Sequence, residues 1–564
     1  METRNVIDIS NLSYTYPGRE APSLVGVDLT VRAGEFVLVS GPTGCGKSTL
    51  LRTMNGIIPH DSGGDLAGSV KVLGRETADA GLVWLSSRVG LVFQSPEDQL
   101  FSSRVEDEVA FGLENLRVPA DEIPERVRRA LGEVGLADCT DVPVAELSGG
   151  QKQRLAIASV LAMHPRVMLL DEPLSQLDPV GAEQVLDVLT SLKRDLGLTI
   201  VLVEHRMHGV VGPADRVVLM DAGRVVLDCE TDRAFDDPAL YDRLGLRLPD
   251  PVALMQKLGR PERPRTPSEA VTLLRTDSGD APAEVRPRET PRREAGEPLV
   301  DLNAVSVRYG RGMPDVLHEV DLRVFPGDVV AVMGANGSGK STLLYTLAGR
   351  LRPSSGSGRV LGEDVTRRRP RRSVEVGMLL QNPELMLLAD RVDEEISAGP
   401  ANLGLGAAEV RRRADEVMRA LGVDPLAAEP PLALSRGQRL RVALASVLSM
   451  EPKLLLLDEP TTGQDRLQIE SMMDHLVEEL SGGAVVFCTH DIQTAARYAN
   501  RVVVLGSGRV LATGTPAGVF ADGDVMRRAG LRPPAIVEIA LALGGPPVTS
   551  VDELARLLST GKKR

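Results

Sequence analysis

Cysteine is scarce in this sequence, and its scarcity limits the class of protein. The 564 residues include only 4 cysteines, at Cys45, Cys139, Cys229 and Cys488. They are too few for a disulfide scaffold, and their spacing is not that of a paired-cysteine metal site. We therefore expect a protein of a reducing cytosol.

Long apolar runs and an excess of positive charge are also missing. No apolar run approaches the roughly 18 residues of a membrane-spanning helix, and no charged-then-apolar signal is seen at the N-terminus. The net charge of −13 argues against a broad nucleic-acid-binding surface. With 43% hydrophobic residues, the chain can fill at least two cores. We expect a soluble protein of several domains.

Two glycine-rich loops share the pattern G-x-x-x-x-G-K-S-T, at residues 41–49 and 334–342. Glycines let successive backbone N–H groups curl around phosphates, the lysine reaches the outer phosphates, and the hydroxyl ligates magnesium. Each loop follows an apolar strand and precedes helix-forming residues, as this motif requires. The predicted ATP-binding residues are Gly41, Gly44, Gly46, Lys47, Ser48 and Thr49 in the first loop, and Gly334, Gly337, Gly339, Lys340, Ser341 and Thr342 in the second.

Adjacent carboxylates follow two aliphatic runs, as Asp171-Glu172 after residues 167–170 and as Asp458-Glu459 after residues 454–457. A buried strand explains each aliphatic run but not the two acids at its end. The first acid can hold Mg²⁺, and the second can orient and deprotonate an attacking water. The sequence therefore predicts two sites of ATP hydrolysis.

The two sets of motifs recur at a nearly constant offset: 293 positions for the loop lysines (340 − 47), 287 for the glutamates (459 − 172) and 285 for two histidines (490 − 205). The repeat predicts two domains in tandem with the same α/β fold. We expect domain 1 at residues 1–276 with a helical extension at about 240–276, a flexible linker at 277–297, and domain 2 at 298–564 with an extension at about 525–564. A coil of roughly 20 residues spans about 25 Å, which favours pairing of the two halves within one chain.

Between loop and carboxylates lie Leu-Ser-Gly-Gly-Gln at residues 147–151 and Leu-Ser-Arg-Gly-Gln at 434–438. With the segments 175–178 and 462–465 and the strand-end histidines His205 and His490, these motifs make both halves resemble ABC-type ATPase domains. The resemblance covers nearly all of the chain outside the linker. It implies two tandem P-loop NTPase domains, each with a helical signature subdomain.

The resemblance also implies composite sites, in which the loop of one half and the signature of the other clamp the same ATP. Implied catalytic residues are Gln94, Glu172 and His205 in one site and Gln381, Glu459 and His490 in the other. Implied Mg²⁺ ligands are Ser48, Gln94 and Asp171, and Ser341, Gln381 and Asp458. The remaining implied ATP contacts are Ser148, Gly150, Gln151, Ser435, Gly437, Gln438 and two aromatic residues for the adenine, Tyr16 and Tyr309.

One signature departs from the pattern, because Arg436 stands where the other has Gly149. The flanking Ser435 and Gly437 are retained, so we expect the site that uses this signature to remain active, with a slower or tighter site as the alternative. Both glutamates are present, so neither half lacks its general base.

The segment after Gln94, Ser-Pro-Glu-Asp-Gln-Leu-Phe, and the stretch Asn-Gly-Ile-Ile-Pro-His at residues 55–60 resemble the ATPases of energy-coupling factor (ECF) and cobalt-type importers, including the hydroxymethylpyrimidine/thiamine class. This resemblance implies a peripheral protein at the cytoplasmic face of the membrane. Its implied partners are a transmembrane T component, docked in a groove beside each glutamine, and a substrate-binding S component for a vitamin or metal ion. The chain itself would not touch the transported substrate.

Other functions stay open at this level. A soluble tandem ABC ATPase of ribosomes or DNA would usually have a long helical linker or cysteine pairs. A fused ATPase for sugars or peptides often has one impaired half, and a nucleotide-gated binding module would not need Glu172 and Glu459. The basic run Arg367–Arg372 favours a solvated loop over a lipid or RNA contact.

Overall fold

The computed structural model describes residues 5–205, 207, 209–277, 296–366, 375–461, 466–479 and 482–561. It divides into two compact units, Met1–Ala253 and Leu254–Arg564. The expected linker and the run Arg367–Arg372 fall almost wholly or wholly outside the described residues. No helix in the described ranges is both long and apolar enough to cross a bilayer.

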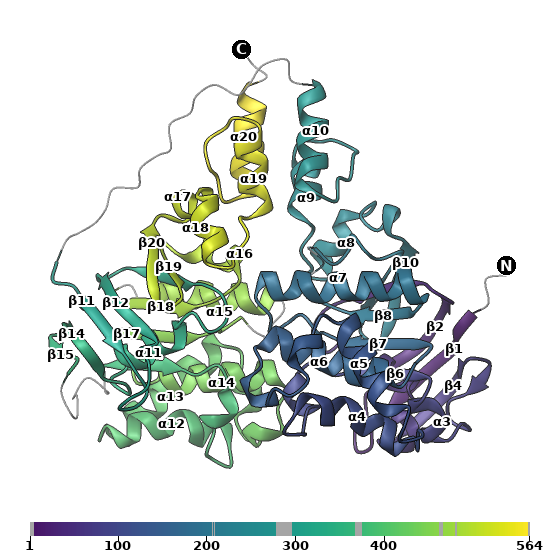
Figure 1. Cartoon of the computed structure of the whole chain (residues 1–564). Coiled ribbons are helices and arrows are strands. Elements are labelled where there is room, and N and C mark those ends of the chain that lie inside the picture. The colour runs from purple at the N-terminus through teal and green to yellow at the C-terminus, as the bar shows by residue number, and fades with distance from the viewer. Residues whose placement is uncertain are drawn as a thin grey trace. The chain divides into compact units, whose positions relative to one another are not determined.

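The first unit contains two sheets (Figure 1). One is antiparallel, in the order β2-β1-β4-β5, and the other has six strands in the order β10-β9-β3-β8-β7-β6. Strands β3, β6, β7, β8 and β9 of the larger sheet are parallel, and β10 returns antiparallel to β9. The strands are β1 (Asn5–Thr15), β2 (Leu24–Arg32), β3 (Phe36–Ser40), β4 (Asp65–Val72), β5 (Arg75–Glu76), β6 (Val89–Val92), β7 (Val167–Asp171), β8 (Thr199–Val203), β9 (Arg216–Asp221) and β10 (Arg224–Glu230).

Strand β3 is buried on both faces because it lies inside the larger sheet. Phe36 and Leu38 pack on the side of the helices, whereas Val37 and Val39 pack against the antiparallel sheet. A strand covered on both faces reads as a continuous apolar run, which explains the uninterrupted Phe-Val-Leu-Val before the first loop. This packing fixes the loop at the carboxyl end of β3.

Helices of the first unit cover the larger sheet and form a separate helical part. The helices are α1 (Lys47–Met54), α2 (Ile57–His60), α3 (Leu82–Ser86), α4 (Val105–Asn115), α5 (Ile123–Glu133), α6 (Gly149–Ala162), α7 (Pro179–Leu196) and α8 (Pro238–Arg243). Helices α4, α5 and α6 pack on one another. The signature motif begins α6, so this part is the expected helical signature subdomain.

The second unit repeats this plan, with an antiparallel sheet β12-β11-β14-β15 and a six-stranded sheet β20-β19-β13-β18-β17-β16. Its strands are β11 (Val300–Val307), β12 (Leu317–Val324), β13 (Val329–Met333), β14 (Pro353–Val360), β15 (Glu363–Asp364), β16 (Val376–Leu379), β17 (Leu454–Asp458), β18 (Ala484–Cys488), β19 (Arg501–Gly506) and β20 (Arg509–Gly514). Its helices are α11 (Lys340–Leu347), α12 (Val392–Asn402), α13 (Ala407–Ala420), α14 (Arg436–Leu448), α15 (Arg466–Glu479), α16 (Ile492–Tyr498), α17 (Pro516–Ala521), α18 (Gly523–Arg528), α19 (Ala535–Ala542) and α20 (Val551–Gly561).

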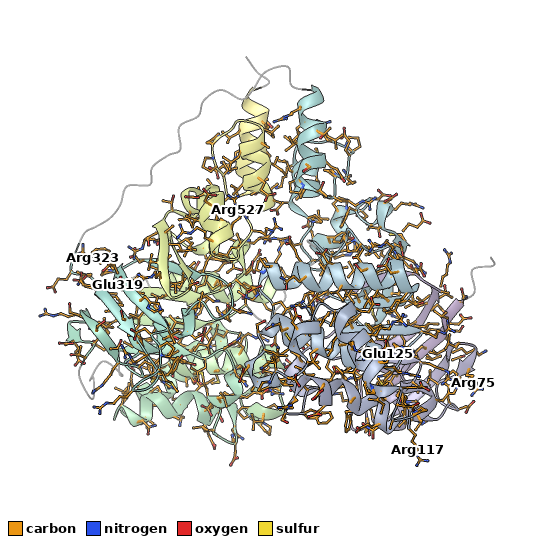
Figure 2. The ribbon with its side chains drawn as sticks, viewed as in Figure 1. Arg75, Arg117, Glu125, Glu319, Arg323 and Arg527 are labelled. Atoms are coloured by element: carbon orange, nitrogen blue, oxygen red, sulfur yellow. The ribbon has the colours of Figure 1, made fainter. Side chains whose placement is uncertain are left out.

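Strand β12 shows why the antiparallel sheet faces water on one side. Its exposed Glu319 and Arg323 alternate with buried Val320, Leu322 and Val324, and Figure 2 labels the two charged residues on this strand. Period-two alternation of this kind is typical of a half-buried antiparallel strand.

Helices α9 (Asp250–Lys257) and α10 (Pro267–Asp277) complete the first extension, but residues from Leu254 onward pack within the second compact unit. There, Ala270 and Leu274 share a core with Ile536 and Val537 of α19. Lys257 also pairs with Asp552 at 2.8 Å. The segment 254–276 thus packs with the second unit although it precedes the expected linker.

Candidate functional site

The two P-loops have the same backbone because their glycines occupy positions that other residues cannot. The φ angles of equivalent glycines agree, at 154° for Gly41 and Gly334 and at 104° and 101° for Gly46 and Gly339. A Cβ at Gly41 would lie 2.3 Å from the carbonyl oxygen of Met220. A Cβ at Gly334 would lie 2.3 Å from the carbonyl oxygen of Leu505. Such close approaches admit glycine only, so each loop is held tightly over its sheet.

Both loop lysines are buried and bond to their own loops. Lys47 Nζ donates to the carbonyl oxygens of Gly41 at 2.9 Å and Pro42 at 2.8 Å. Lys340 Nζ donates to Gly334 at 2.9 Å and to the carbonyl of residue 335 at 3.1 Å. The ammonium group of each lysine thus lies at the centre of its loop, where a phosphate would be bound.

The loop serine and the first carboxylate of each pair lie within hydrogen-bond distance. Ser48 Oγ donates to Asp171 Oδ1 at 3.0 Å, and Ser341 Oγ donates to Asp458 Oδ1 at 3.1 Å. Burial raises the pKa of both aspartates, and the serine hydrogen bonds act in the opposite direction. A hydroxyl beside a carboxylate is a set of hard oxygen donors that fits Mg²⁺.

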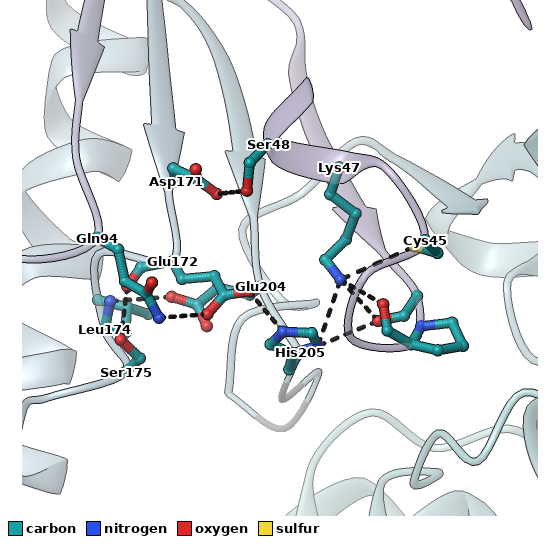
Figure 3. A network of polar contacts seen from close by, with 12 residues as sticks. Cys45, Lys47, Ser48, Gln94, Asp171, Glu172, Leu174, Ser175, Glu204 and His205 are labelled. Carbon is teal, nitrogen blue, oxygen red and sulfur yellow. Dashed lines mark hydrogen bonds and ion pairs between the residues drawn. The ribbon is translucent and has the colours of Figure 1, made fainter. Parts of the chain in front are cut away.

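Glu172 is the centre of a polar network in the first unit, and Figure 3 shows its neighbours pointing toward it. Gln94 Nε2 donates to Glu172 Oε2 at 2.8 Å, and His205 Nε2 lies 2.5 Å from Glu172 Oε1. The other ring nitrogen of His205 lies 3.0 Å from the Gly41 carbonyl oxygen and 3.4 Å from Lys47 Nζ. The imidazole therefore joins the glutamate to the P-loop.

The second unit brings together the same residue types in a different arrangement. Here His490 Nδ1 lies 2.9 Å from Glu459 Oε2, a close contact that lacks hydrogen-bond direction, and Lys340 Nζ lies 3.9 Å from Glu459 Oε1. Gln94 is partly buried, whereas its counterpart Gln381 is exposed. The two sites share their residues but differ in which ring nitrogen faces the glutamate.

The charge state of Glu459 follows from its neighbours. Burial acts to raise the pKa of its carboxyl, but His490 and Lys340 outweigh burial and lower the pKa below the ordinary value of 4.5. Glu459 is therefore ionised at neutral pH. An ionised carboxylate is the state in which it can accept a proton from water.

Both glutamates adopt the left-handed backbone conformation, with φ of 47° at Glu172 and 50° at Glu459. This conformation is uncommon for a residue with a side chain. It occurs at the same step of both units, directly after the strand that carries the aspartate. Neighbouring hydrogen bonds must hold it in place.

Tyr16 and Tyr309, the predicted adenine-binding residues, lie beside the helices that follow the P-loops. The Tyr16 hydroxyl is 3.3 Å from Thr49 Oγ1, and the Tyr309 hydroxyl is 3.0 Å from Thr342 Oγ1. Tyr309 is 56% exposed. An exposed aromatic face at this position can stack on a base.

Each signature begins a helix with a capping box. Ser148 Oγ accepts from the backbone N–H of Gln151 at 3.3 Å while Gln151 Oε1 accepts from that of Ser148 at 2.9 Å, and Ser435 and Gln438 repeat both bonds with the same lengths. The helix start requires no glycine at its first position, so Arg436 replaces Gly149 without changing the cap. Gly150 and Gly437 follow at the second helical position.

Three buried acids were not found by sequence reasoning. Glu204 accepts from the backbone N–H of Leu174 at 2.9 Å. Glu108 and Glu395 each accept from two successive backbone N–H groups of the loop before their helix. Glu204 has one signal in the sequence, since it is an acid directly after the apolar β8. Glu108 and Glu395 follow other acids in the first turn of their helices, and nothing in the sequence distinguishes them.

Comparison with known proteins agrees with this geometry. The model of the family described as ABC transporter matches residues 24–175 and 317–462. A Methanosarcina mazei protein named "Putative ABC transporter ATP-binding protein" is 47% identical over 550 residues, which cover 96% of this chain and 94% of that one. A Streptomyces avermitilis protein of the same name is 40% identical over 554 residues, with 91% and 94% covered.

Among solved structures, cbiO1 from Clostridium perfringens, described as part of the ABC transporter complex cbiONQ, is 35% identical. The match covers 45% of this chain and 99% of that chain, with a TM-score of 0.39. The family model and the relatives of similar length establish that this chain belongs to the ABC transporter family, as an ATPase with two ATP-binding domains in tandem.

Proposed function

We propose that the chain is the energy-coupling ATPase of an ECF-type importer for a vitamin or a metal ion. Its two halves close on two ATP molecules, and the change is passed to a transmembrane T component at the cytoplasmic face of the membrane. A separate S component selects the substrate. The supporting observation is a pair of exposed apolar loops, one after each catalytic glutamine.

In the first unit, this loop presents aromatic side chains to solvent. Phe101 is 62% exposed and stacks edge-to-face on Phe111 of α4, which is 43% exposed, with ring centroids 4.4 Å apart. Phe93, beside Gln94, is 39% exposed. Three of the eight phenylalanines in the chain are thus exposed on or next to this loop, and an apolar cluster in water is typical of a protein-binding surface.

In the second unit, the corresponding loop presents aliphatic side chains, since Leu385 is 72% exposed and Leu388 is 89% exposed. The two loops therefore differ in the type of apolar side chain that they expose. This difference suits a membrane partner that offers two unlike helices, and the fusion of the halves fixes which loop meets which helix.

Both loops are held rigidly by a buried glutamate of the following helix. Glu108 Oε2 accepts from the N–H groups of Phe101 at 3.1 Å and Ser102 at 2.7 Å. Glu395 Oε2 accepts from Leu388 and Ala389, both at 2.7 Å. A surface held in one conformation loses less entropy when a partner binds, so these exposed side chains are prepared for docking.

Each loop is also tied to the signature helix of its own unit. Lys152 of α6 pairs with Glu97 at 2.8 Å, and Arg439 of α14 pairs with Glu384. Exposed ion pairs of this type contribute little to stability. These pairs do, however, connect each docking loop to the signature helix of its unit. Through them, binding of a partner's helix and binding of ATP can favour the same closing movement of the halves.

The proposed hydrolysis uses the residues that each half brings together around its P-loop. Lys47 and the P-loop bind the phosphates, Glu172 orients the attacking water and accepts its proton, and His205 holds Glu172 against the loop. Ser48 and Asp171 would hold Mg²⁺, which when bound supplies positive charge to the phosphate oxygens. As the resemblance to ABC ATPases implies, we expect Ser435 and Gly437 of the other half to act on this ATP, and Ser148 and Gly150 to act on the second.

The test is purification of the tagged full-length protein from detergent-solubilised native membranes, followed by mass spectrometry. The proposal expects a polytopic membrane protein and a small substrate-binding membrane protein to be recovered with the wild type and with the Glu172→Gln/Glu459→Gln variant. Recovery of ribosomal or DNA-repair proteins without a membrane protein would overturn it.

A further inference from the structure

Glu172 directly follows β7, and His205 lies just after the neighbouring strand β8. Hydrogen bonds between these two segments continue past the ends of the strands. In the first unit, the backbone N–H of Glu172 donates to the Val203 carbonyl oxygen at 3.0 Å. One more hydrogen bond follows, from the backbone N–H of Leu174 to Glu204 Oε1 at 2.9 Å. We call this second bond the strand-end link of the first unit.

Glu204 is well placed for a role in the site because it directly precedes His205 and is only 4% exposed. Its backbone N–H donates to the Val39 carbonyl oxygen at 3.1 Å, so the residue is fixed to the strand that leads into the P-loop. Its side chain reaches the opposite way, to the backbone two residues after Glu172. One residue therefore joins the P-loop strand, the histidine and the backbone that follows the glutamate.

The second unit has a link at the same two positions but builds it from other side chains. Thr489 directly precedes His490, and Thr461 lies two residues after Glu459, as Leu174 does after Glu172. The two threonine hydroxyls are 3.4 Å apart and are both buried. The pair Leu174/Glu204 and the pair Thr461/Thr489 thus connect equivalent points by different chemistry.

We propose that Glu204 is a positioning residue for ATP hydrolysis in the first unit, where it holds the left-handed backbone of Glu172 in register with His205. The Thr461–Thr489 pair serves the same purpose in the second unit through a longer contact. Glu204 does not touch ATP. The inference rests on the proposed catalytic roles of Glu172 and His205 and is independent of the membrane partner.

Steady-state hydrolysis of ATP with Mg²⁺ by the full chain tests the inference. Glu204→Ala is expected to lower kcat to half or less while the KM for ATP stays within about two-fold. Glu204→Ala with Thr489→Val removes both links and is expected to lower kcat at least ten-fold. An unchanged kcat in the double variant, or a rise in KM with kcat retained, would overturn the proposal.

Two rescue variants separate positioning from folding. Glu204→Gln keeps the side-chain oxygen that accepts the bond and is expected to keep kcat within about three-fold of the wild type. Leu174→Thr with Glu204→Thr gives both halves the threonine pair and is expected to restore most of the kcat lost in Glu204→Ala. If Leu174→Thr/Glu204→Thr is as slow as Glu204→Ala while both melt at the wild-type temperature, the link is not what positions Glu172.

Glu172→Gln with Glu459→Gln is the control for the catalytic roles themselves. If this variant hydrolyses ATP normally, the proposed mechanism fails. If it is inactive while Glu204→Ala/Thr489→Val is fully active, only the role of Glu204 fails.

Discussion

His205 Nε2 lies 2.5 Å from Glu172 Oε1, whereas in the second unit it is the Nδ1 atom of His490 that lies 2.9 Å from Glu459. The same two residue types therefore meet through opposite sides of the imidazole ring. In the first unit, the remaining nitrogen contacts the P-loop carbonyl of Gly41. The two sites should accordingly differ in how firmly the histidine joins the glutamate to the loop.

Replacement of the two glutamates proposed as general bases should separate the contributions of the two sites. General acid–base groups contribute typically 10²–10⁴-fold to rate, so Glu172→Gln/Glu459→Gln should retain less than about 1% of the wild-type kcat and still bind ATP. Each single variant should retain measurable turnover from the other site. Steady-state assays together with nucleotide-binding titrations check this, and a fully active double variant would refute the assignment of the general bases.

The decrease of kcat at acidic pH should depend on His490. Burial acts to raise the pKa of Glu459, and His490 and Lys340 lower it, so removal of His490 leaves Lys340 alone against burial and the pKa of Glu459 should rise from its wild-type position. Since the carboxylate must be ionised to accept a proton, His490→Ala should move the acid limb of the second site to higher pH. The readout is the kcat profile normalised to its maximum. If the acidic decrease of kcat occurs at the same pH in His490→Ala as in the wild type, His490 does not control the charge of Glu459.

Arg436 should be tolerated in its signature. Because the capping box forms from Ser435 and Gln438 regardless of the residue between them, Arg436→Gly should change kcat by no more than about two-fold. Ser435→Ala, the matched control, should lower kcat by an order of magnitude or more, as expected for loss of a donor to the phosphate. Equal effects of both substitutions would mean that the arginine itself is part of the site.

The buried strand β8, which ends two residues before His205, should be sensitive to side-chain truncation. Leu202 is fully buried in β8, so Leu202→Ala should cost about 2–5 kcal/mol of stability. Leu196 at the end of α7 is 41% exposed, and its alanine variant should change stability by about 0.5 kcal/mol or less. Thermal and denaturant unfolding of the two variants gives the comparison; similar losses would contradict the assigned core.

Local motifs predict the parts of the site that lie within one continuous segment. The P-loops, the Asp171-Glu172 and Asp458-Glu459 pairs and the capped signatures all have their chemistry encoded in a few adjacent residues. Their pairing with Gln94 and His205 was predicted through resemblance to a known family. The structure confirms the tandem ABC fold, while the joining of a loop from one half to a signature of the other stays a prediction.

The features that the sequence does not reveal depend on contacts that form only in the folded chain, at short as well as long separations. Glu204 accepts a hydrogen bond because the backbone N–H of Leu174 lies beside it in the fold. Glu108 likewise holds its loop because the N–H groups of residues 101 and 102 face it. The packing of α10 on α19 also joins residues more than 250 positions apart. The segment 462–465, which carries part of the second repeat, lies outside the described residues.

The central claim is that the loops after Gln94 and Gln381 dock a membrane protein. Phe101→Gln and Leu388→Gln together remove the most exposed apolar side chain of each loop and leave their backbone bonds to Glu108 and Glu395 intact. The matched control is Leu196→Gln, which changes an exposed leucine elsewhere on the surface.

Affinity purification from detergent-solubilised membranes, with ATP hydrolysis measured in parallel, is the direct measurement. The loop variant should retain ATP hydrolysis and lose the membrane protein that the wild type and the control variant recover. Recovery of the same membrane protein in equal amount from the loop variant would contradict the proposed docking surface.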